Sequence, residues 1–394
     1  KQTNAHIGLV WSPDGSPLYA AGGNDDAVYA YTNGNGMWSQ AAKIALGHSA
    51  THGKAGVGLG VEPNVSGLAI SADGRTLVVA NNFNDSISVI DTATKTVRYE
   101  HDLRPYFANN EGTSGVPGGE YPLGVAITGN DTAYVSSNRD REVVVVDISS
   151  PTAGHLVTRI KLDGNGNEMT LNAAQSTLYV AQDNADQVAV IDTATNTITN
   201  KIDARAPAGM LPGPQYTGAA TFGVTISPDG KTLYAVNDGS NSIAVIPLTG
   251  ADANTVTGLI PTAYAPKDIT FSPDGSWMYI INGKSNTGPN PHYLMGNTAL
   301  ITNKQYPGGN AAAAVASRAS NSYQFQLEHA TLVSAQVPSS GDLANMTAVV
   351  ARNNLYSPSN SSARPDEQYC RIGTAVFMPP PCWLDRIPDH ICQA

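Results

Sequence analysis

The chain has 394 residues, of which 41% are hydrophobic and only 14% are charged, and it contains 38 glycines and 25 prolines. This composition is typical of many short strands joined by tight turns rather than of long amphipathic helices. The 22 basic residues are outnumbered by 32 acidic ones and form no basic cluster, which argues against binding to nucleic acid. No apolar run is long enough to cross a bilayer, so we expect no membrane span.

The first residues bear on where the protein resides. The sequence starts at Lys1 without a methionine, and residues 1–10 lack the basic and then apolar plan of a signal peptide. We therefore expect that an upstream segment was removed. An extracytoplasmic location, secreted or periplasmic, fits this expectation.

A hairpin signal near the N-terminus recurs along the chain. A strand at residues 8–11 runs into Ser-Pro-Asp-Gly at 12–15, and a second strand follows at 18–21. Proline presets φ at the first turn position and glycine accepts a positive φ at the last, so the tetrapeptide predicts a tight turn between paired strands. Near-copies stand at 71–74, 227–230 and 272–275, and degenerate copies stand at 128–131 and 172–175. Six copies are visible.

Each hairpin is followed by two further strands. A polar turn such as 82–85 leads into a β-branched run such as 86–91, and an Asp-Thr-Ala-Thr turn such as 192–195 leads into a shorter outer strand. Four strands per repeat are the unit of a propeller blade. The predicted fold is therefore all-β, a β-propeller of four-stranded antiparallel blades. We place the blades at about 5–46, 63–104, 120–163, 166–204, 219–262 and 265–338.

An insertion interrupts the last blade. Its strands are expected at 268–272, 277–282, 323–327 and 332–337, and residues 283–320 form a long loop between the second and the third. Loops of this length without secondary structure are usually functional or mobile.

The propeller domain is thus expected to cover residues 1–338, and residues 339–394 to form a separate C-terminal region. That region begins with a helical linker at 342–354 and ends in a proline-containing tail. All three cysteines, Cys370, Cys382 and Cys392, lie in this tail. They allow one disulfide plus a leftover thiol, and the sequence leaves the pairing open.

The repeats resemble the YVTN/YncE-like propeller family over roughly residues 5–338. The repeats of that family carry Ser-Pro-Asp-Gly, Leu-Tyr-Val-Ala-Asn and Ile-Ser-Val-Ile-Asp-Thr segments, and the repeats of this chain follow the same pattern. A narrower resemblance is to the propeller half of bacterial proteins that fuse a YncE-like propeller to an alkaline-phosphatase-superfamily (phosphoesterase) domain. It is carried by residues 22–29, 119–122, 131–137, 139–146 and 323–328. The resemblance implies seven blades, whereas six are recognisable. We expect the ring to be open, or to be closed by the tail or by self-association. No phosphatase metal motif is present, so phosphatase activity is not expected.

Propeller ligands usually bind at the mouth of the central channel, where the innermost strands begin. The residues that we predict at this rim, and predict to bind a ligand, are His6, Glu120, Tyr121, Glu168, Phe222, Lys267 and Asp268, beside Asn64, Ser66, Asn167 and Thr221. The three acids would supply oxygens for a divalent cation or, with His6, would form an acid/base set. The alternative is a solvated polar rim.

Two other motifs have structural explanations. The turns at 23–26, 82–85 and 183–186 have the acids of a calcium loop without its spacing, and Asn and Asp suit tight turns, so a structural role is favoured. His48 and His52 lie four residues apart, but their Gly-rich surroundings predict a mobile connection rather than a helix that holds a metal. The loop at 47–62 is expected to cap one face of the disc, together with loops at 105–119 and 205–218.

No nucleophile elbow, phosphate-binding loop or haem-attachment motif occurs in the sequence. We therefore predict a non-catalytic propeller that binds a partner protein or a small ligand at the capped face, with no cofactor apart from the divalent cation considered above. The alternative is a propeller hydrolase, lactonase-like or a metal-dependent phosphoester hydrolase, that uses the acidic channel rim. Lactonase-like proteins share the Ser-Pro-Asp-Gly blades, which keeps this alternative open.

Overall fold

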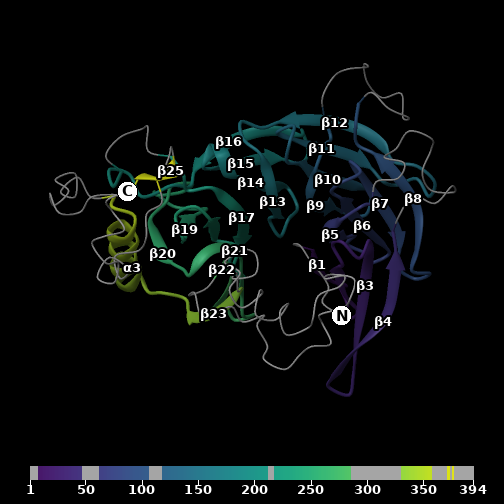
Figure 1. Ribbon diagram of the computed structural model, residues 1–394, viewed down its shortest axis with the longest axis horizontal. Helices are drawn as coiled ribbons and strands as arrows, with labels where there is room; N and C mark the ends of the chain where they lie inside the picture. The colour runs from purple at the N-terminus through teal and green to yellow at the C-terminus, as the bar shows by residue number, and fades with distance from the viewer. Residues whose placement is uncertain are drawn as a thin grey trace, which may run out of the picture.

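The structure, a computed structural model, describes residues 8–46, 62–105, 118–211, 217–284 and 330–356, together with the short strands β24 (Arg371–Ile372) and β25 (Ala375–Val376). The sheets follow one another around a common centre, as the blades of a propeller do (Figure 1). The fold is therefore the all-β propeller that the sequence predicts. Within the described ranges, no helix is long and apolar enough to cross a membrane.

Five blades have four antiparallel strands, and the innermost strand of each blade comes first in the chain. The first blade consists of β1 (Leu9–Trp11), β2 (Leu18–Ala21), β3 (Ala27–Gly34) and β4 (Met37–Ala45). The second consists of β5 (Val65–Ile70), β6 (Thr76–Asn81), β7 (Ser86–Asp91) and β8 (Thr96–Asp102). The third consists of β9 (Pro122–Thr128), β10 (Thr132–Ser137), β11 (Glu142–Asp147) and β12 (His155–Lys161).

The fourth blade consists of β13 (Gly166–Leu171), β14 (Thr177–Gln182), β15 (Gln187–Asp192) and β16 (Thr197–Asp203), with the 3₁₀ turn η1 (Asp183–Ala185) after β14. The fifth consists of β17 (Thr221–Ile226), β18 (Thr232–Asn237), β19 (Ser242–Pro247) and β20 (Gly258–Pro261). The sixth has three described strands, β21 (Tyr264–Phe271), β22 (Trp277–Lys284) and β23 (Thr331–Gln336). The six predicted repeats are confirmed as six sheets.

The Ser-Pro-Asp-Gly turns join the first two strands of a blade, as predicted. In the fifth blade, the Ser227 hydroxyl donates to Asp229 Oδ1 at 2.6 Å and accepts from the Thr232 amide at 3.0 Å. Gly230 takes a φ of 73°, in the left-handed region that glycine adopts without strain. Local residues alone fix this turn, which is why its sequence identifies it.

Neighbouring blades bury apolar side chains against each other. Between the second and third blades, Val78 and Val89 pack with Val125 and Val144, and none of the four is more than 9% exposed. The innermost strands contact one another in the order β1, β5, β9, β13, β17 and β21 (Figure 1). Each blade between the first and the sixth is thus stabilised from both sides by burial, at about 25 cal/mol per Å² of apolar surface.

A second device, which we call the latch, joins successive blades. The side chain of an Asp or Asn in the hairpin between a blade's second and third strands accepts a hydrogen bond from the backbone of the next blade. These bonds run from the amide of Asn64 to Asp26 (2.8 Å), of Tyr121 to Asp85 (3.0 Å), of Ala220 to Asp186 (2.7 Å) and of Ala265 to Asn241 (2.8 Å). All eight residues have a positive φ. The acidic turns therefore have the structural role that the sequence favours, and their last acid bonds to the next blade.

The sixth blade differs from its prediction. The sequence predicts residues 332–337 as the fourth strand, but β23 is the third, because it pairs directly with β22 and places Leu332 opposite Ile281. The place of a strand in a sheet depends on the strand with which it pairs. Residues 331–336 pair with the free edge of β22, so no other strand lies between them. The segment 323–327 and residues 285–320 of the predicted long loop lie outside the described residues.

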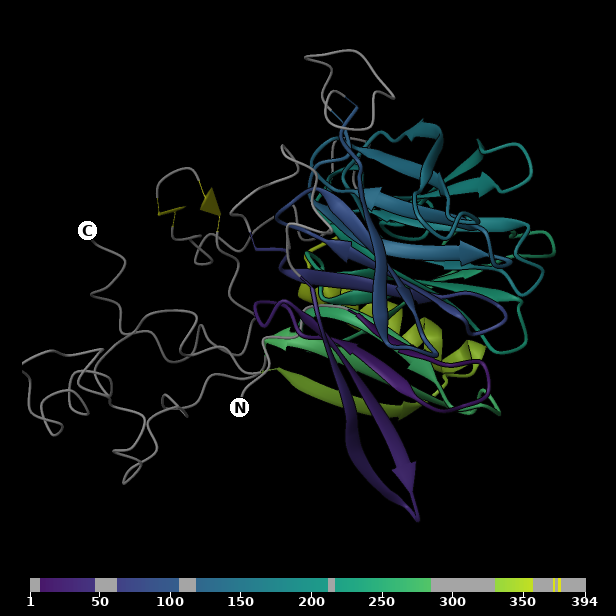
Figure 2. The same cartoon turned by 90° about the vertical axis from the view of Figure 1, so that its right-hand side faces the viewer.

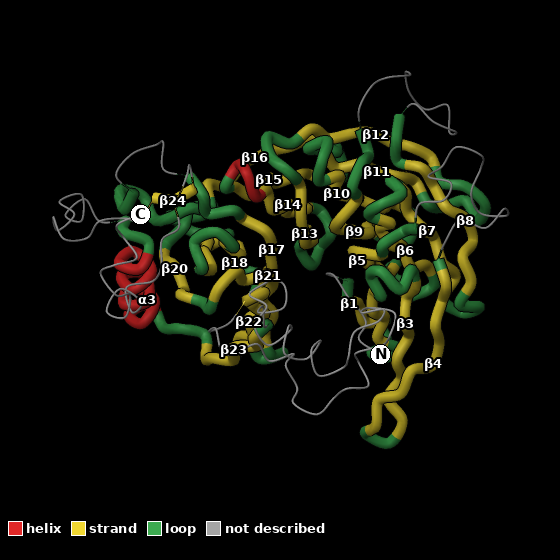
Figure 3. Tube along the Cα trace, viewed as in Figure 1, coloured by secondary structure: helices red, strands yellow, loops and turns green. Residues whose placement is uncertain are grey.

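Helix α3 (Ser340–Asn353) follows β23 and lies against β20, the outer strand of the fifth blade (Figure 3). Ser339 caps the helix by accepting a hydrogen bond from the Asp342 amide at 3.2 Å. The Thr347 hydroxyl accepts from the Leu259 amide at 2.9 Å, and Val350 is only 1% exposed. A helix therefore forms at the expected linker, but it packs on the propeller. The three cysteines lie outside the described residues.

The first and sixth blades face an opening in the described part of the ring (Figure 1). In the first blade, Leu9 and Trp11 lie on the face that other blades pack against the preceding blade, yet they are 65% and 51% exposed. In the sixth blade, Leu332 and Ile281 lie on the face that other blades pack against the following one, and they are 67% and 44% exposed. We call these two facing surfaces the seam. Within the described residues, these two faces are exposed rather than packed against a neighbouring blade. That the ring is open, or is closed by the tail or by self-association, stays a prediction.

The β3–β4 hairpin of the first blade projects beyond the disc (Figure 2). Met37 and Trp38, near its tip, are 76% and 48% exposed. The rings of Trp38 and Trp11 meet edge to face, with their centroids 5.2 Å apart. The hairpin therefore extends the exposed apolar surface of the seam.

Candidate functional site in the central channel

The innermost strands share an irregularity on the wall of the central channel. In the second, third, fourth, fifth and sixth blades, the register between the first and second strands shifts near the start of the innermost strand. Such β-bulges turn side chains away from the regular alternation and are frequent beside functional sites. The residues at the bulges, rather than those of the regular ladder, are therefore the first candidates for contact with a ligand.

One bulge position separates two blades from the other four. It is glycine in the first, second, third and fifth blades, at Gly8, Gly67, Gly124 and Gly223. A Cβ at Gly67 would lie 2.2 Å from the carbonyl oxygen of Leu123 on the next innermost strand, so the close approach of these strands requires glycine. In the fourth and sixth blades the same position holds Glu168 and Asp268. Two blades have therefore replaced a structural glycine with an acid.

The two acids influence each other in the channel. Glu168 Oε2 lies only 2.7 Å from where a Cβ of Gly223 would be, so its carboxyl group rests on the innermost strand of the fifth blade, between its own blade and Asp268. Burial raises the pKa of Glu168 well above its ordinary value, the negative charge of Asp268 raises it further, and Lys267 partly offsets both. The protonated form of Glu168 is therefore favoured.

Asp268 has a smaller shift. Burial raises its pKa to about 6, although the Ile269 amide donates a hydrogen bond to Asp268 Oδ1 at 2.7 Å and so favours the charged form. Both acids keep partial contact with solvent. The site thus combines a carboxyl group whose protonated form is favoured with one whose pKa is about 6. Two carboxyl groups with shifted pKa values are the combination that acid and base catalysis uses.

Lys267 joins the same site from the bulge of β21. Its Nζ lies 3.0 Å from Asp238 Oδ2, in the β18–β19 hairpin, and 4.6 Å from the centroid of the Phe222 ring. Asp238 Oδ1 is buried and has no hydrogen-bond partner among the described residues. The ammonium group is thus held between a carboxylate and an aromatic face.

The structure brings together four of the seven predicted rim residues, namely Glu168, Phe222, Lys267 and Asp268. Glu120 and Tyr121 belong to a separate cluster at the second and third blades. There, Glu120 Oε2 lies 2.8 Å from Arg139 Nη1, and the Arg139 guanidinium lies 5.9 Å from the centroid of the Tyr121 ring. His6 lies outside the described residues, as do His48 and His52.

Other predicted rim residues have structural partners. The Ser66 hydroxyl donates to the carbonyl oxygen of Pro122 at 3.1 Å, and the Thr221 hydroxyl donates to Asn237 Oδ1 at 2.9 Å. In the part of the chain that is described, no three His, Cys, Asp or Glu side chains come together to hold a metal ion. The predicted cation set of Glu120, Glu168 and Asp268 is therefore not assembled here.

Asp238 and Gly223 are functional candidates that the sequence reasoning missed. Asp238 stands in a polar hairpin without a motif. The signal for the acids themselves was available, because aligning the repeats shows an acid where glycine is the rule.

Comparisons with known proteins agree with this architecture. The sequence model of a family described as "Lactonase, 7-bladed beta-propeller" matches residues 168–289, a segment that holds all four residues of the channel site. The chain is a β-propeller. The seven-bladed β-propeller protein Rv1057 of Mycobacterium tuberculosis is 30% identical over 146 residues, which cover 35% of this chain and 32% of that protein. The chain thus matches about a third of the length of this relative.

One solved structure supports the same fold, and a second is reported beside it. A putative 6-phosphogluconolactonase from Bacteroides uniformis has a TM-score of 0.53 at 17% sequence identity, and the match covers 71% of this chain and 78% of that one. A streptogramin B lyase has a TM-score of 0.49 at 17% identity, with 69% and 74% covered. Both sequence matches are to seven-bladed propellers, while the YncE-like and phosphatase-fusion resemblance stays a prediction.

Proposed function

We propose that the protein hydrolyses lactones in its central channel, with Asp268 as the base and Glu168 as the acid. The observation that carries this proposal is the replacement of the repeat's glycine by two acids whose charges interact. The family match supports it, because residues 168–289 resemble lactonases and contain both acids. The fold similarity to a putative 6-phosphogluconolactonase suggests lactones of sugar acids as the substrate class.

In the proposed reaction, the carbonyl group of the lactone lies between the two carboxyl groups. Asp268, with a pKa of about 6, is ionised at neutral pH and accepts a proton from the attacking water. Glu168 donates a hydrogen bond to the carbonyl oxygen as negative charge develops on it. Glu168 then gives its proton to the ring oxygen as the carbon–oxygen bond breaks. Water has thus been added across the ester bond to yield a hydroxy acid, and the proton on Asp268 returns to Glu168 through solvent.

The test uses the full chain with two probes, glucono-δ-lactone and its 6-phosphate, at pH 5 to 9. We expect turnover above the rate in buffer, rising with pH through about 6 as Asp268 ionises. It should fall at higher pH as Glu168 loses its proton. Asp268→Asn and Glu168→Gln should each lower kcat by about 10²- to 10⁴-fold. Asp163→Asn, at an exposed acid in the connection between the third and fourth blades, is the control and should leave kcat unchanged.

Two results would contradict a hydrolase: no turnover of either lactone above the rate in buffer, or full activity in both carboxyl variants. Binding without turnover is the second candidate function. The Lys267–Asp238 ion pair favours it, because a neutralised ammonium group stabilises a negatively charged transition state less well. Calorimetric titration with the same lactones identifies this case as saturable binding without hydrolysis. A protein partner at the capped face and an extracytoplasmic location stay predictions.

A further inference from the structure

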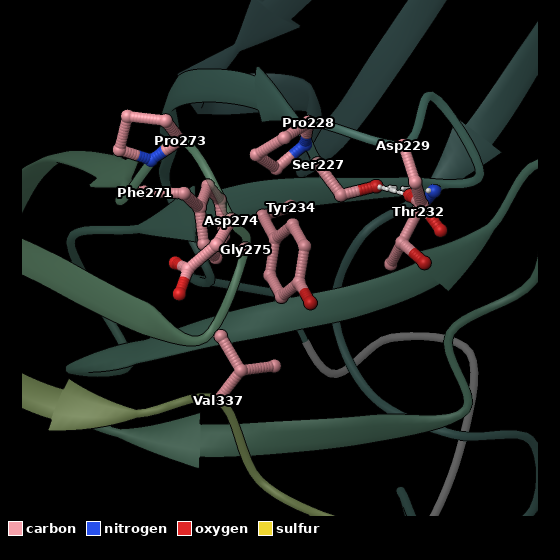
Figure 4. A pocket seen from close by; sticks show the side chains of 10 residues that line it. All are labelled: Ser227, Pro228, Asp229, Thr232, Tyr234, Phe271, Pro273, Asp274, Gly275 and Val337. Carbon is pink, nitrogen blue, oxygen red and sulfur yellow. Dashed lines mark hydrogen bonds between the residues drawn. The ribbon is translucent and has the colours of Figure 1, made fainter.

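A pocket of about 450 Å³ opens between the fifth and sixth blades, on the face that carries the Ser-Pro-Asp-Gly turns (Figure 4). Tyr234 and Phe271 lie side by side in it, with their ring centroids 4.7 Å apart. Pro228 and Pro273 lie on the turns beside them. The pocket is at the opposite end of the blades from the bulges, so it is separate from the channel site.

The repeat explains why a pocket is present here. Tyr134 occupies the position of Tyr234 in the third blade, and its hydroxyl donates to the carbonyl oxygen of Thr193 at 3.1 Å and to Asn196 Oδ1 at 2.8 Å. Both acceptors belong to the turn between the third and fourth strands of the next blade. In the sixth blade, the chain leaves β23 at Gln336 and enters helix α3 instead of making that turn. The pocket between the fifth and sixth blades therefore corresponds to the space that the turn at 193–196 fills between the third and fourth blades.

The hydroxyl group of Tyr234 is available to an occupant of the pocket. The residue is only 6% exposed, and its hydroxyl group faces the pocket without a hydrogen-bond partner among the described residues. The hydroxyl oxygen is not among the atoms that are shielded from solvent, so an occupant with a hydrogen-bond acceptor would take the place of water there.

The pocket also carries negative charge. The Ser227 hydroxyl lowers the pKa of Asp229, and the Ser272 hydroxyl and the Ser276 amide help lower that of Asp274 to about 2. Both acids are therefore ionised at neutral pH. Lys231 lies 3.9 Å from Asp229 Oδ2, but both side chains are mostly exposed, so this pairing is weak. An occupant with a positive charge is thus favoured.

We propose that this pocket binds a peptide turn that carries a basic side chain, supplied by a partner protein. A backbone carbonyl of the turn accepts the hydrogen bond of Tyr234, as Thr193 does for Tyr134. The Lys or Arg side chain of the turn pairs with Asp229 and Asp274 at the mouth. A peptide turn with a Lys or Arg side chain supplies both the acceptor and the positive charge.

The test measures fluorescence anisotropy of a labelled peptide that copies residues 191–197 with Ala194→Lys, titrated with the full chain. We expect saturable binding, at least tenfold tighter than that of the same peptide with Ala194→Glu. Tyr234→Phe, which removes only the hydroxyl, should weaken binding about threefold to tenfold. Asp274→Asn should weaken it by a similar factor, and less so in high salt.

Matched controls stand at the same repeat positions of other blades. Tyr179→Phe in the fourth blade and Asp73→Asn in the second should leave the affinity for the peptide unchanged. The proposal is overturned by equal affinity for the Lys and Glu peptides, by no saturation at millimolar concentration, or by an unchanged affinity of Tyr234→Phe. It is also overturned if lysine amide alone competes as well as the peptide, because the pocket would then be a site for small cations.

Discussion

The packed interfaces between neighbouring blades and the seam are built from equivalent residues of the repeat. Leu68 and Leu9 each follow the repeat's glycine, at Gly67 and Gly8, yet Leu68 is 8% exposed and Leu9 is 65% exposed. Val236 and Ile281 hold equivalent places in their second strands and are 0% and 44% exposed. Each blade thus carries two apolar faces, and the presence of a neighbouring blade, rather than the residue type, decides whether a face is buried.

The sharpest check of this contrast uses one substitution at both leucines. Leu68→Ala should lower the free energy of unfolding by about 2–5 kcal/mol, because it leaves a cavity between two packed blades. Leu9→Ala should lower it by less than about 0.5 kcal/mol, because the side chain is already in solvent. Urea denaturation with a common slope measures both. Equal losses would show that the seam is covered in solution.

The pH dependence of stability at Asp85, whose side chain forms a latch, tests a packed interface between two blades. Burial raises the pKa of Asp85 to about 6, against an ordinary value of 3.8, even though Tyr121 and Arg104 favour its charged form. The folded state therefore binds this proton more tightly, so the carboxylate lowers stability above pH 6 and the penalty disappears below about pH 4. Asp85→Asn keeps an acceptor for the Tyr121 amide and should stabilise the protein by about 1–2 kcal/mol at pH 8.

Asp91 provides a control of opposite sign. Hydrogen bonds from the Thr94 amide and from Arg98 lower its pKa to about 2, so its stabilisation is present at neutral pH and is lost as the pH falls through 2. Asp91→Asn should therefore destabilise the protein at pH 8, where Asp85→Asn stabilises it. Melting temperatures of both variants and of the wild-type chain at pH 4 and pH 8 give the sign of each stability change. A gain from Asp85→Asn that is the same at both pH values would be inconsistent with a titrating latch.

The smallest effect is expected from association through the seam. Exposed apolar surface on both facing blades favours weak self-association at micromolar concentrations. The double variant Leu9→Lys and Leu332→Lys should weaken this association about tenfold, whereas Val157→Lys, on an exposed residue of the outer strand β12, should not. Sedimentation velocity over a concentration series is the measurement. A wild-type chain that stays monomeric throughout would show that the seam does not self-associate.

Most of the fold was readable from the sequence because local residues encode it. The Ser-Pro-Asp-Gly turn is fixed by its own hydroxyl, carboxylate and glycine, so it marks each hairpin without tertiary information. The sixth blade was misassigned at residues 332–337 because strand position depends on which edge is free. The number of strands counted along the chain does not determine it.

The channel site was readable only in part. The repeat placed Glu168, Phe222, Lys267 and Asp268 at the rim, but the sequence could not show that Glu120 is instead paired with Arg139. The role of Asp238 was also hidden, because it depends on the approach of the fifth and sixth blades. The latches went unrecognised for the same reason. Their left-handed turns are local, but the amides that they bond belong to the next blade.

The seam changes the topology of unfolding. A closed ring of blades has no end, so opening it requires the separation of two packed faces at once. Here the innermost strands contact one another in a row from β1 to β21, and the described chain behaves as a linear array with two terminal units. We therefore expect local opening to start at β1 and β23 and to proceed inward. Amide protection should accordingly be greatest in the third and fourth blades, which lie farthest from either end.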